Sequence, residues 1–189
     1  MYNNIENDEE LIKRVQAGDC DAFNPLIARY KLPLYKMMYR MVYNRDDAED
    51  LVEEAFIKAY RAIDRFSAEK KFFPWIYRIA INNALNFLKS KRRQKAESLS
   101  QYENRLMDMK TDPVKITENK ILKEKVNQAI VRLPDEYRVI INLRVEQECS
   151  YDEISQILNI PKGTVMSRLA RARKKLKEIL KKLEAINEM

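Results

Sequence analysis

Glycine is almost absent from this chain, which limits the folds and sites that it can form. Only 2 of its 189 residues are glycine. Gly-rich phosphate loops and dinucleotide-binding turns need several glycines, because the bare backbone must approach the phosphates. Leu, Ile, Ala, Lys and Glu are abundant instead, and these residues favour helix. We therefore expect an all-α fold without a nucleotide-binding loop.

Histidine is absent and cysteine is rare, which excludes further classes of site. Without histidine, imidazole metal sites, catalytic triads and histidine proton shuttles cannot form. Cys20 and Cys149 lack metal-ligand spacing, and we expect both to be buried free thiols in a reduced, cytoplasmic protein. No segment approaches the roughly 20 apolar residues that span a bilayer. The sequence predicts no enzyme, cofactor, metal ion or membrane insertion.

The charge balance favours a polyanionic partner. Lys and Arg total 36 against 29 for Asp and Glu, which gives a net charge of +7. Nucleic acid is a better match for this excess than a membrane surface, although a soluble domain can also be basic without binding either.

Apolar residues recur at helical spacing in two parts of the chain. We predict two small helical domains, residues 1–95 and 116–189. Residues 96–115 are polar and lack this periodicity, so we interpret them as a flexible linker.

The segment from Ser150 to Leu180 has the pattern of a helix-turn-helix. Ser150 and Glu153 have the spacing of a capping box. Asn159 tolerates a left-handed turn conformation, and Pro161 suits the first turn of the next helix. Two helices joined by so short a turn predict a DNA-binding motif whose second helix enters the major groove.

The second helix of this motif has one apolar and one basic face. Nine basic residues and a single acid, Glu178, lie between Lys162 and Lys182. We expect Ser167 and Arg171 to contact base edges, because they lie opposite the apolar stripe near the helix start. A solvated basic face is the alternative interpretation. The candidate DNA contacts are Lys162, Gly163, Thr164, Ser167, Arg168, Arg171, Arg173 and Lys174. Of these, Lys162, Arg173 and Lys174 suit phosphates, and Gly163 allows close backbone approach.

Acidic residues crowd the start of a helix in the first domain. They are Asp46, Asp47, Glu49, Asp50, Glu53 and Glu54. Acids in a first turn stabilise the helix dipole, but this cluster is denser than that role requires. A basic protein partner is expected, and a carboxylate metal site is the alternative.

Aromatic and basic residues alternate from Arg65 to Lys95. Rings that stack on bases, beside cations that follow the backbone, suit single-stranded DNA. We expect Phe72, Phe73 and Phe87 to lie in the core, whereas Trp75 and Tyr77 can be core or interface.

These segments together resemble the extracytoplasmic-function (ECF) group of bacterial sigma factors, over nearly the whole chain. The stretches RVQAGDCDAFNPLIARY, DAEDLVEEAFIKAYRAIDRF and FFPWIYRIAINNAL are similar to the second conserved region of that family. The stretch LPDEYRVIINLRVEQECSYDEISQILNIPKGTVMSRLARARKKL is similar to the fourth. SYDEI followed by GTVMSRLARAR is the most specific match.

The resemblance implies an alternative sigma factor that binds core RNA polymerase, recognises −10 and −35 promoter elements and helps melt the promoter. It places the coiled coil of the largest polymerase subunit on Asp47, Asp50, Glu53, Glu54 and Lys58. It places −10 recognition and melting on Arg65, Phe66, Lys70, Lys71, Trp75, Tyr77, Arg78, Asn82 and Asn86, with a flipped base in the loop 66–73. It gives the −35 element to the C-terminal helix and a second polymerase contact to the flap of the second-largest subunit.

The resemblance also implies a separate anti-sigma protein and a linker that threads towards the polymerase active-site channel. Met37, Met38 and Met41 could contact the anti-sigma protein, or they could pack in the core. The chain departs from the family pattern at Glu53, where Gln is usual, and at Asn86, where Asp is frequent.

Three other functions compete with this hypothesis. A conventional helix-turn-helix regulator would bind duplex DNA without polymerase, and a sigma-like adaptor would bind polymerase without directing initiation. A carboxylate-metal nuclease or recombinase would use Asp46, Asp47 and Asp50.

Overall fold

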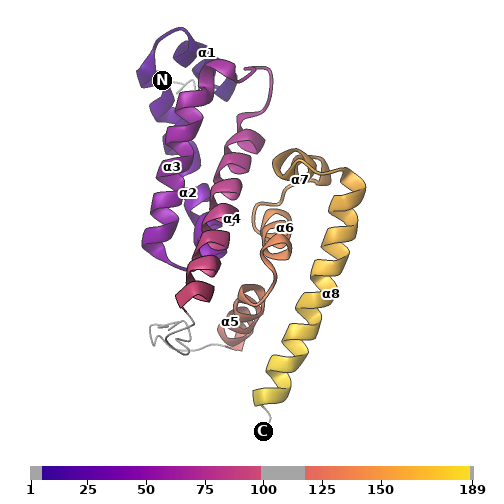
Figure 1. Cartoon of the computed structure of the whole chain (residues 1–189). Helices are drawn as coiled ribbons and strands as arrows, with labels where there is room; N and C mark the ends of the chain where they lie inside the picture. Colours follow the sequence, from indigo (N-terminus) through magenta and orange to yellow (C-terminus); the bar gives the residue numbers. More distant parts are fainter. Residues whose placement is uncertain (1–5, 99–117, 188–189) are drawn as a thin grey trace.

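The computed structural model describes residues 6–98 and 118–187, and within these ranges every regular element is helical. The elements are α1 (Asp8–Gln16), α2 (Phe23–Val42), α3 (Arg45–Ala62), α4 (Phe72–Ser98), α5 (Glu118–Val131), α6 (Asp135–Val145), α7 (Tyr151–Leu158) and α8 (Lys162–Asn187). Short 3-10 turns lie at Cys20–Ala22 and Ile63–Arg65. The predicted all-α fold is confirmed (Figure 1).

The first half is a bundle in which α2, α3 and α4 pack side by side. Its core includes Met37, Met38 and Met41, all without exposed surface. The alternative in which these three methionines contact an anti-sigma protein is therefore wrong for this conformation, because their side chains fill the space between helices.

The second half contains the predicted helix-turn-helix. Ser150 and Glu153 form both hydrogen bonds of the capping box at the start of α7. Asn159 ends α7 in the left-handed conformation, with φ 52°. Val165 and Leu169 of α8 are buried against the rest of this half. The local sequence signals for this motif are confirmed.

The two halves pack against each other, with α6 and α7 beside α2 and α4 (Figure 1). Arg138 of α6 is buried and donates from Nη1 to the carbonyl oxygen of Met41, at 2.7 Å. Arg40 of α2 pairs with Glu146 at 2.6 Å. Long α4 forms much of this contact, and it continues to Ser98. The first three residues of the predicted linker 96–115 are therefore helical, and the remainder lies outside the described residues.

No helix in the described ranges combines the length and the apolar character needed to cross a membrane.

The two cysteines differ in their surroundings. Cys149 is buried, and this burial raises the pKa of its thiol to about 12. Cys20 is exposed in the turn between α1 and α2, so the expectation that both thiols are buried is wrong for Cys20. Cys20 lies in the short 3-10 turn that links two helices, rather than on a helix face packed into the core.

We predict that Ellman's reagent modifies one thiol rapidly in the native protein and two after denaturation. The thiolate is the reactive form, and burial suppresses both ionisation and access at Cys149. Cys20→Ser should abolish the rapid phase and leave the denatured protein with one reactive thiol. Rapid reaction of both thiols in the native chain would contradict the buried position of Cys149.

Candidate nucleic-acid interface

The basic face of α8 is presented to solvent as the sequence predicted. Gly163, Ser167 and Arg171 are exposed in its first turns, and so are Arg173 and Lys174. Thr164 is half-buried. A Cβ atom added to Gly163 would meet no heavy atom within 4 Å. The N-terminal turns of α8 can therefore approach a surface closely, as a recognition helix must.

Two cations of the predicted set are paired within the protein. Lys162 lies 2.9 Å from Asp152 of α7. Arg168 lies 3.7 Å from Glu136 of α6, and its side chain is only 28% exposed. To bind phosphate, Lys162 would have to leave Asp152, and Arg168 would have to leave Glu136.

Met166 was missed by the sequence analysis. Its side chain is 54% exposed, and in the described part of α8 no other large apolar side chain is exposed to this degree. It lies beside Ser167 near the helix start, where a recognition helix meets base edges. An apolar side chain there can contact the methyl group of thymine, which is the apolar feature of the major groove. Its position between Thr164 and Ser167, both candidate DNA contacts, was the sequence feature that could have identified it.

A second surface with rings and cations lies along α4 and the loop before it. Trp75, Arg78, Asn82 and Asn86 recur at helical spacing on one face of α4, with both asparagines exposed. Phe66 is buried and packs on Trp75, with ring centroids 4.4 Å apart. Contact with Phe66 thus restricts the position of the Trp75 ring.

Tyr77 and its neighbours belong to the interior. Tyr77 has no exposed surface, packs on Phe73 at 4.4 Å and donates its hydroxyl to Oε1 of Gln147. Burial raises the pKa of Tyr77. Phe72 is buried as expected, while Phe73 and Phe87 are partly buried against the core. Tyr77 meets the second half of the chain in this structure, rather than solvent.

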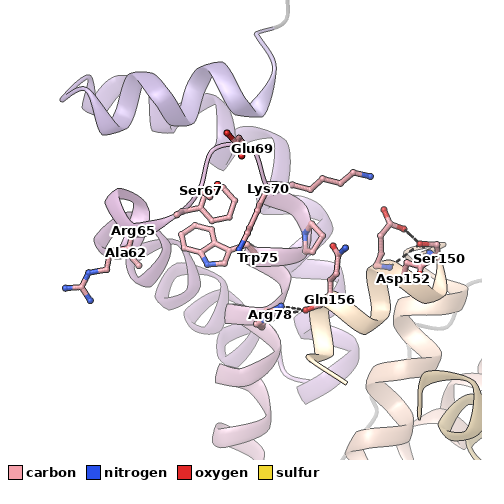
Figure 2. Close-up of a pocket in the computed structure, with 14 residues that line it drawn as sticks. Ala62, Arg65, Ser67, Glu69, Lys70, Trp75, Arg78, Ser150, Asp152 and Gln156 are labelled. Carbon is pink, nitrogen blue, oxygen red and sulfur yellow. Dashed lines mark hydrogen bonds between the residues drawn. The ribbon is translucent and has the colours of Figure 1, made fainter. Parts of the chain in front are cut away.

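A cavity of about 840 Å³ separates the loop and α4 from α7. Figure 2 shows Trp75 and Lys70 on one side, and Asp152 and Gln156 on the other. The first half contributes four cations to the lining, which are Arg65, Lys70, Lys71 and Arg78. An aromatic ring in a cavity lined by cations is a combination that suits single-stranded nucleic acid.

The acidic cluster forms an exposed face of α3. Asp50, Glu53 and Glu54 are exposed, and Ile57 on the next turn is 42% exposed. Ile57 was not singled out from the sequence, although it lies three and four residues after the two glutamates and so on their face. An apolar residue surrounded by acids suits a protein contact with a basic rim.

Three predicted members of this face, Asp47, Glu54 and Lys58, have partners within the protein. Asp47 accepts a hydrogen bond from Lys91 at 2.9 Å, and Lys58 contacts both Glu54 and Asn83. Among the described residues, no three His, Cys, Asp or Glu side chains are grouped as metal ligands would be.

Comparison with known proteins gives matches in both halves. Residues 26–94 match the family model described as Sigma-70 region 2, and residues 123–176 match the model described as Sigma-70, region 4. The chain is 39% identical to the ECF RNA polymerase sigma factor SigW of Bacillus subtilis (strain 168), over 91% of this chain and 96% of that protein. It is 40% identical to the ECF RNA polymerase sigma-E factor of Escherichia coli (strain K12), over 88% and 90%.

Solved structures share the fold. CnrH in complex with the cytosolic domain of CnrY superposes with a TM-score of 0.67 at 22% identity, covering 92% of this chain and 97% of that chain. The sigma factor RpoE in complex with the anti-sigma factor NepR from Bartonella quintana gives 0.66 at 23% identity, covering 84% and 96%.

Gly163→Ala should leave the fold intact and weaken binding to duplex promoter DNA. The added methyl group meets nothing within the protein, and alanine stabilises a helix by up to about 1 kcal/mol relative to glycine. Thermal unfolding should thus be unchanged or shifted upward, while gel-shift titration with polymerase and promoter shows weaker binding. Unchanged DNA affinity would mean that the backbone of Gly163 does not approach the duplex.

Proposed function

The chain belongs to the ECF group of the sigma-70 family. From this premise we propose that it is an alternative sigma factor that directs transcription initiation, and that different surfaces of the chain carry out different steps. Proteins of this family bind core RNA polymerase and promoter DNA and are not enzymes. We assign −10 recognition to the first half, 1–95, and −35 recognition to the second, 116–189, with 96–115 as the connection. Its place of action is then the cytoplasm.

The observation that supports this assignment is that one chain presents two basic surfaces of different chemistry. The exposed start of α8 offers hydrogen-bonding and apolar side chains on a narrow convex helix, which suits duplex DNA in the major groove. The cavity beside α4 offers a held indole ring and four cations, which suits unpaired bases. A conventional regulator needs only the first.

We assign −35 recognition to Arg171 and Ser167, with Met166 as an additional apolar contact. Both predicted polar residues are exposed and project from the first turns of α8. Arg173 and Lys174 lie farther along the same helix, where they can hold phosphates and fix the register.

We assign −10 recognition to the cavity and to the exposed asparagines of α4. Trp75 is partly exposed towards the cavity and supported by Phe66. A base flipped from the duplex costs a few kcal/mol of unstacking, which a ring and a closely fitting pocket offset. Because Tyr77 is turned into the interior, its proposed role is to support Phe73 and α4 rather than to touch DNA.

We assign core-polymerase binding to the acidic face of α3, with Ile57 at its centre. Exposed Asp50, Glu53 and Glu54 give the face its charge, and Ile57 provides apolar area that a protein partner can bury. A separate anti-sigma protein remains part of the proposal through family membership.

In vitro transcription with sigma-free core RNA polymerase tests the function. Purified chain is added to core enzyme with a pool of genomic promoter fragments, and core alone is the control. Discrete new transcripts that require the chain are expected. Specific duplex binding by the free chain without any transcripts would favour a conventional regulator instead.

On a promoter that requires the chain, Arg171→Ala should impair recognition of the −35 element and Trp75→Ala should impair melting of the −10 element. Arg171→Ala should lose about 1–3 kcal/mol of binding and the preference for one −35 base pair. Trp75→Ala should lose about 1–3 kcal/mol of base stacking and should regain activity on a template with an unpaired −10 bubble. Transcription from duplex and bubble templates, side by side, separates the two. A bubble that rescues Arg171→Ala but not Trp75→Ala would reverse our assignment.

A further inference from the structure

Helix α1 ends against the turn that leads into the loop 66–73. Gln16 is the last residue of α1, and its partly buried amide nitrogen donates to the carbonyl oxygens of Ile63 and Phe66, each at 2.7 Å. Both acceptors are backbone carbonyls, so the nitrogen of the amide must face them and not its oxygen. One side chain thus binds the start of the loop at two points.

These two carbonyls lie where the backbone changes from helix to extended chain. Ile63 begins the 3-10 turn Ile63–Arg65, and Phe66 follows it with φ −81° and ψ 127°. The carbonyl oxygen of Ile63 also accepts from the backbone nitrogen of Phe66, at 3.0 Å. Gln16 adds a second donor to that oxygen and supplies a donor to the carbonyl of Phe66. Its hydrogen bonds therefore fix the direction in which the loop leaves the turn.

Phe66 connects this restraint to the ring that we assign to −10 DNA. Its side chain is buried and packs on Trp75, with ring centroids 4.4 Å apart. Among the described residues that line the cavity, Phe66 and Trp75 are present and Gln16 is not. A shift of the Phe66 backbone would change the support of the indole ring. Gln16 can therefore act on the cavity only through these two residues.

Helix α1 also supports the far end of the loop. Asp8, in its first turn, accepts a hydrogen bond from the hydroxyl of Tyr30 and pairs with Arg29. The Tyr30 ring packs on Phe72, the first residue of α4, at a centroid distance of 5.3 Å. Burial and the hydrogen bond to Asp8 raise the pKa of Tyr30, so its hydroxyl keeps the proton that it donates. Both ends of the loop are thus restrained by α1, which precedes the residues 26–94 that match Sigma-70 region 2.

We propose that Gln16 is a positioning residue for −10 recognition, which fixes the loop 66–73 and, through Phe66, the orientation of Trp75. This inference rests on the proposed −10 role of Trp75. A ring that is already fixed loses less freedom when it stacks on a base, so loss of the two hydrogen bonds should weaken the capture of an unpaired base. Binding to core polymerase through α3 should not depend on Gln16.

Two variants remove the donated hydrogen bonds and keep the length of the side chain. Gln16→Met replaces the amide with an apolar group of similar size, and Gln16→Glu carries a carboxylate, which when ionised only accepts. The matched control is Asn24→Leu, which also exchanges an amide for an apolar group, at an exposed position of α2. Circular dichroism and pull-down with core polymerase establish that each full-length variant is folded and binds through α3.

The fluorescence of the free chain tests the positioning of the ring without DNA. Trp75 is the single tryptophan, so its emission reports on this site alone. Both Gln16 variants should lower the steady-state anisotropy of this emission and increase its quenching by acrylamide, since a less restrained ring moves more freely. Asn24→Leu should change neither. Unchanged anisotropy and quenching in both Gln16 variants would overturn the proposal.

A double-mutant cycle tests the consequence for transcription. Transcription from a duplex promoter should fall about five- to tenfold in Gln16→Met, because two hydrogen bonds are lost. The loss should nearly disappear in a Trp75→Ala background, since Gln16 acts through that ring, and should remain in full in an Arg171→Ala background, since α8 makes an independent contact. An equal loss in both backgrounds would mean that Gln16 only stabilises the fold, and would overturn the proposal. Absence of transcripts from the parent chain would instead reject the proposed function, while the fluorescence result still decides the positioning of Trp75.

Discussion

The closed arrangement of this protein depends on cations that cap the ends of helices. Arg138 donates to the carbonyls of Met41 near the end of α2, and of Val131 and Leu133 at the end of α5. These carbonyls have no partners within their helices, and the helix dipole makes them a favourable place for a cation. Burial lowers the pKa of Arg138, so the carbonyls must offset the cost of taking the charge out of water. One side chain thereby fixes two helices of different halves to α6.

The same principle connects fold and function at the other end of the contact. Arg78 caps α7, yet it belongs to the surface that we assign to promoter DNA. A guanidinium that satisfies helix carbonyls can satisfy phosphate oxygens equally well. Arg78 therefore belongs both to the contact between the halves and to the surface that we assign to DNA.

Local features of the fold were predictable from the sequence, and contacts between distant segments were not. The capping box at Ser150, the left-handed Asn159 and the apolar stripe of α8 depend on neighbours within a few residues. The burial of Tyr77 depends on Gln147, which lies 70 residues away, and periodicity contains no information on such a pairing. The exposure of Cys20, Ile57 and Met166 likewise depends on which helix faces remain uncovered after packing. Family motifs predicted which surfaces bind partners, but not which segments of the two halves pack together.

The most direct test measures the distance between the halves with and without polymerase. A spin label on the exposed native Cys20 and another on Lys177→Cys of α8 report it by pulsed electron paramagnetic resonance, since Cys149 is buried and stays unlabelled. Because we assign the two halves to separate promoter elements, our account predicts a single narrow distance in the free chain and a longer one after core RNA polymerase is added. The same distance distribution in both states, or a broad one in the free chain, would contradict it.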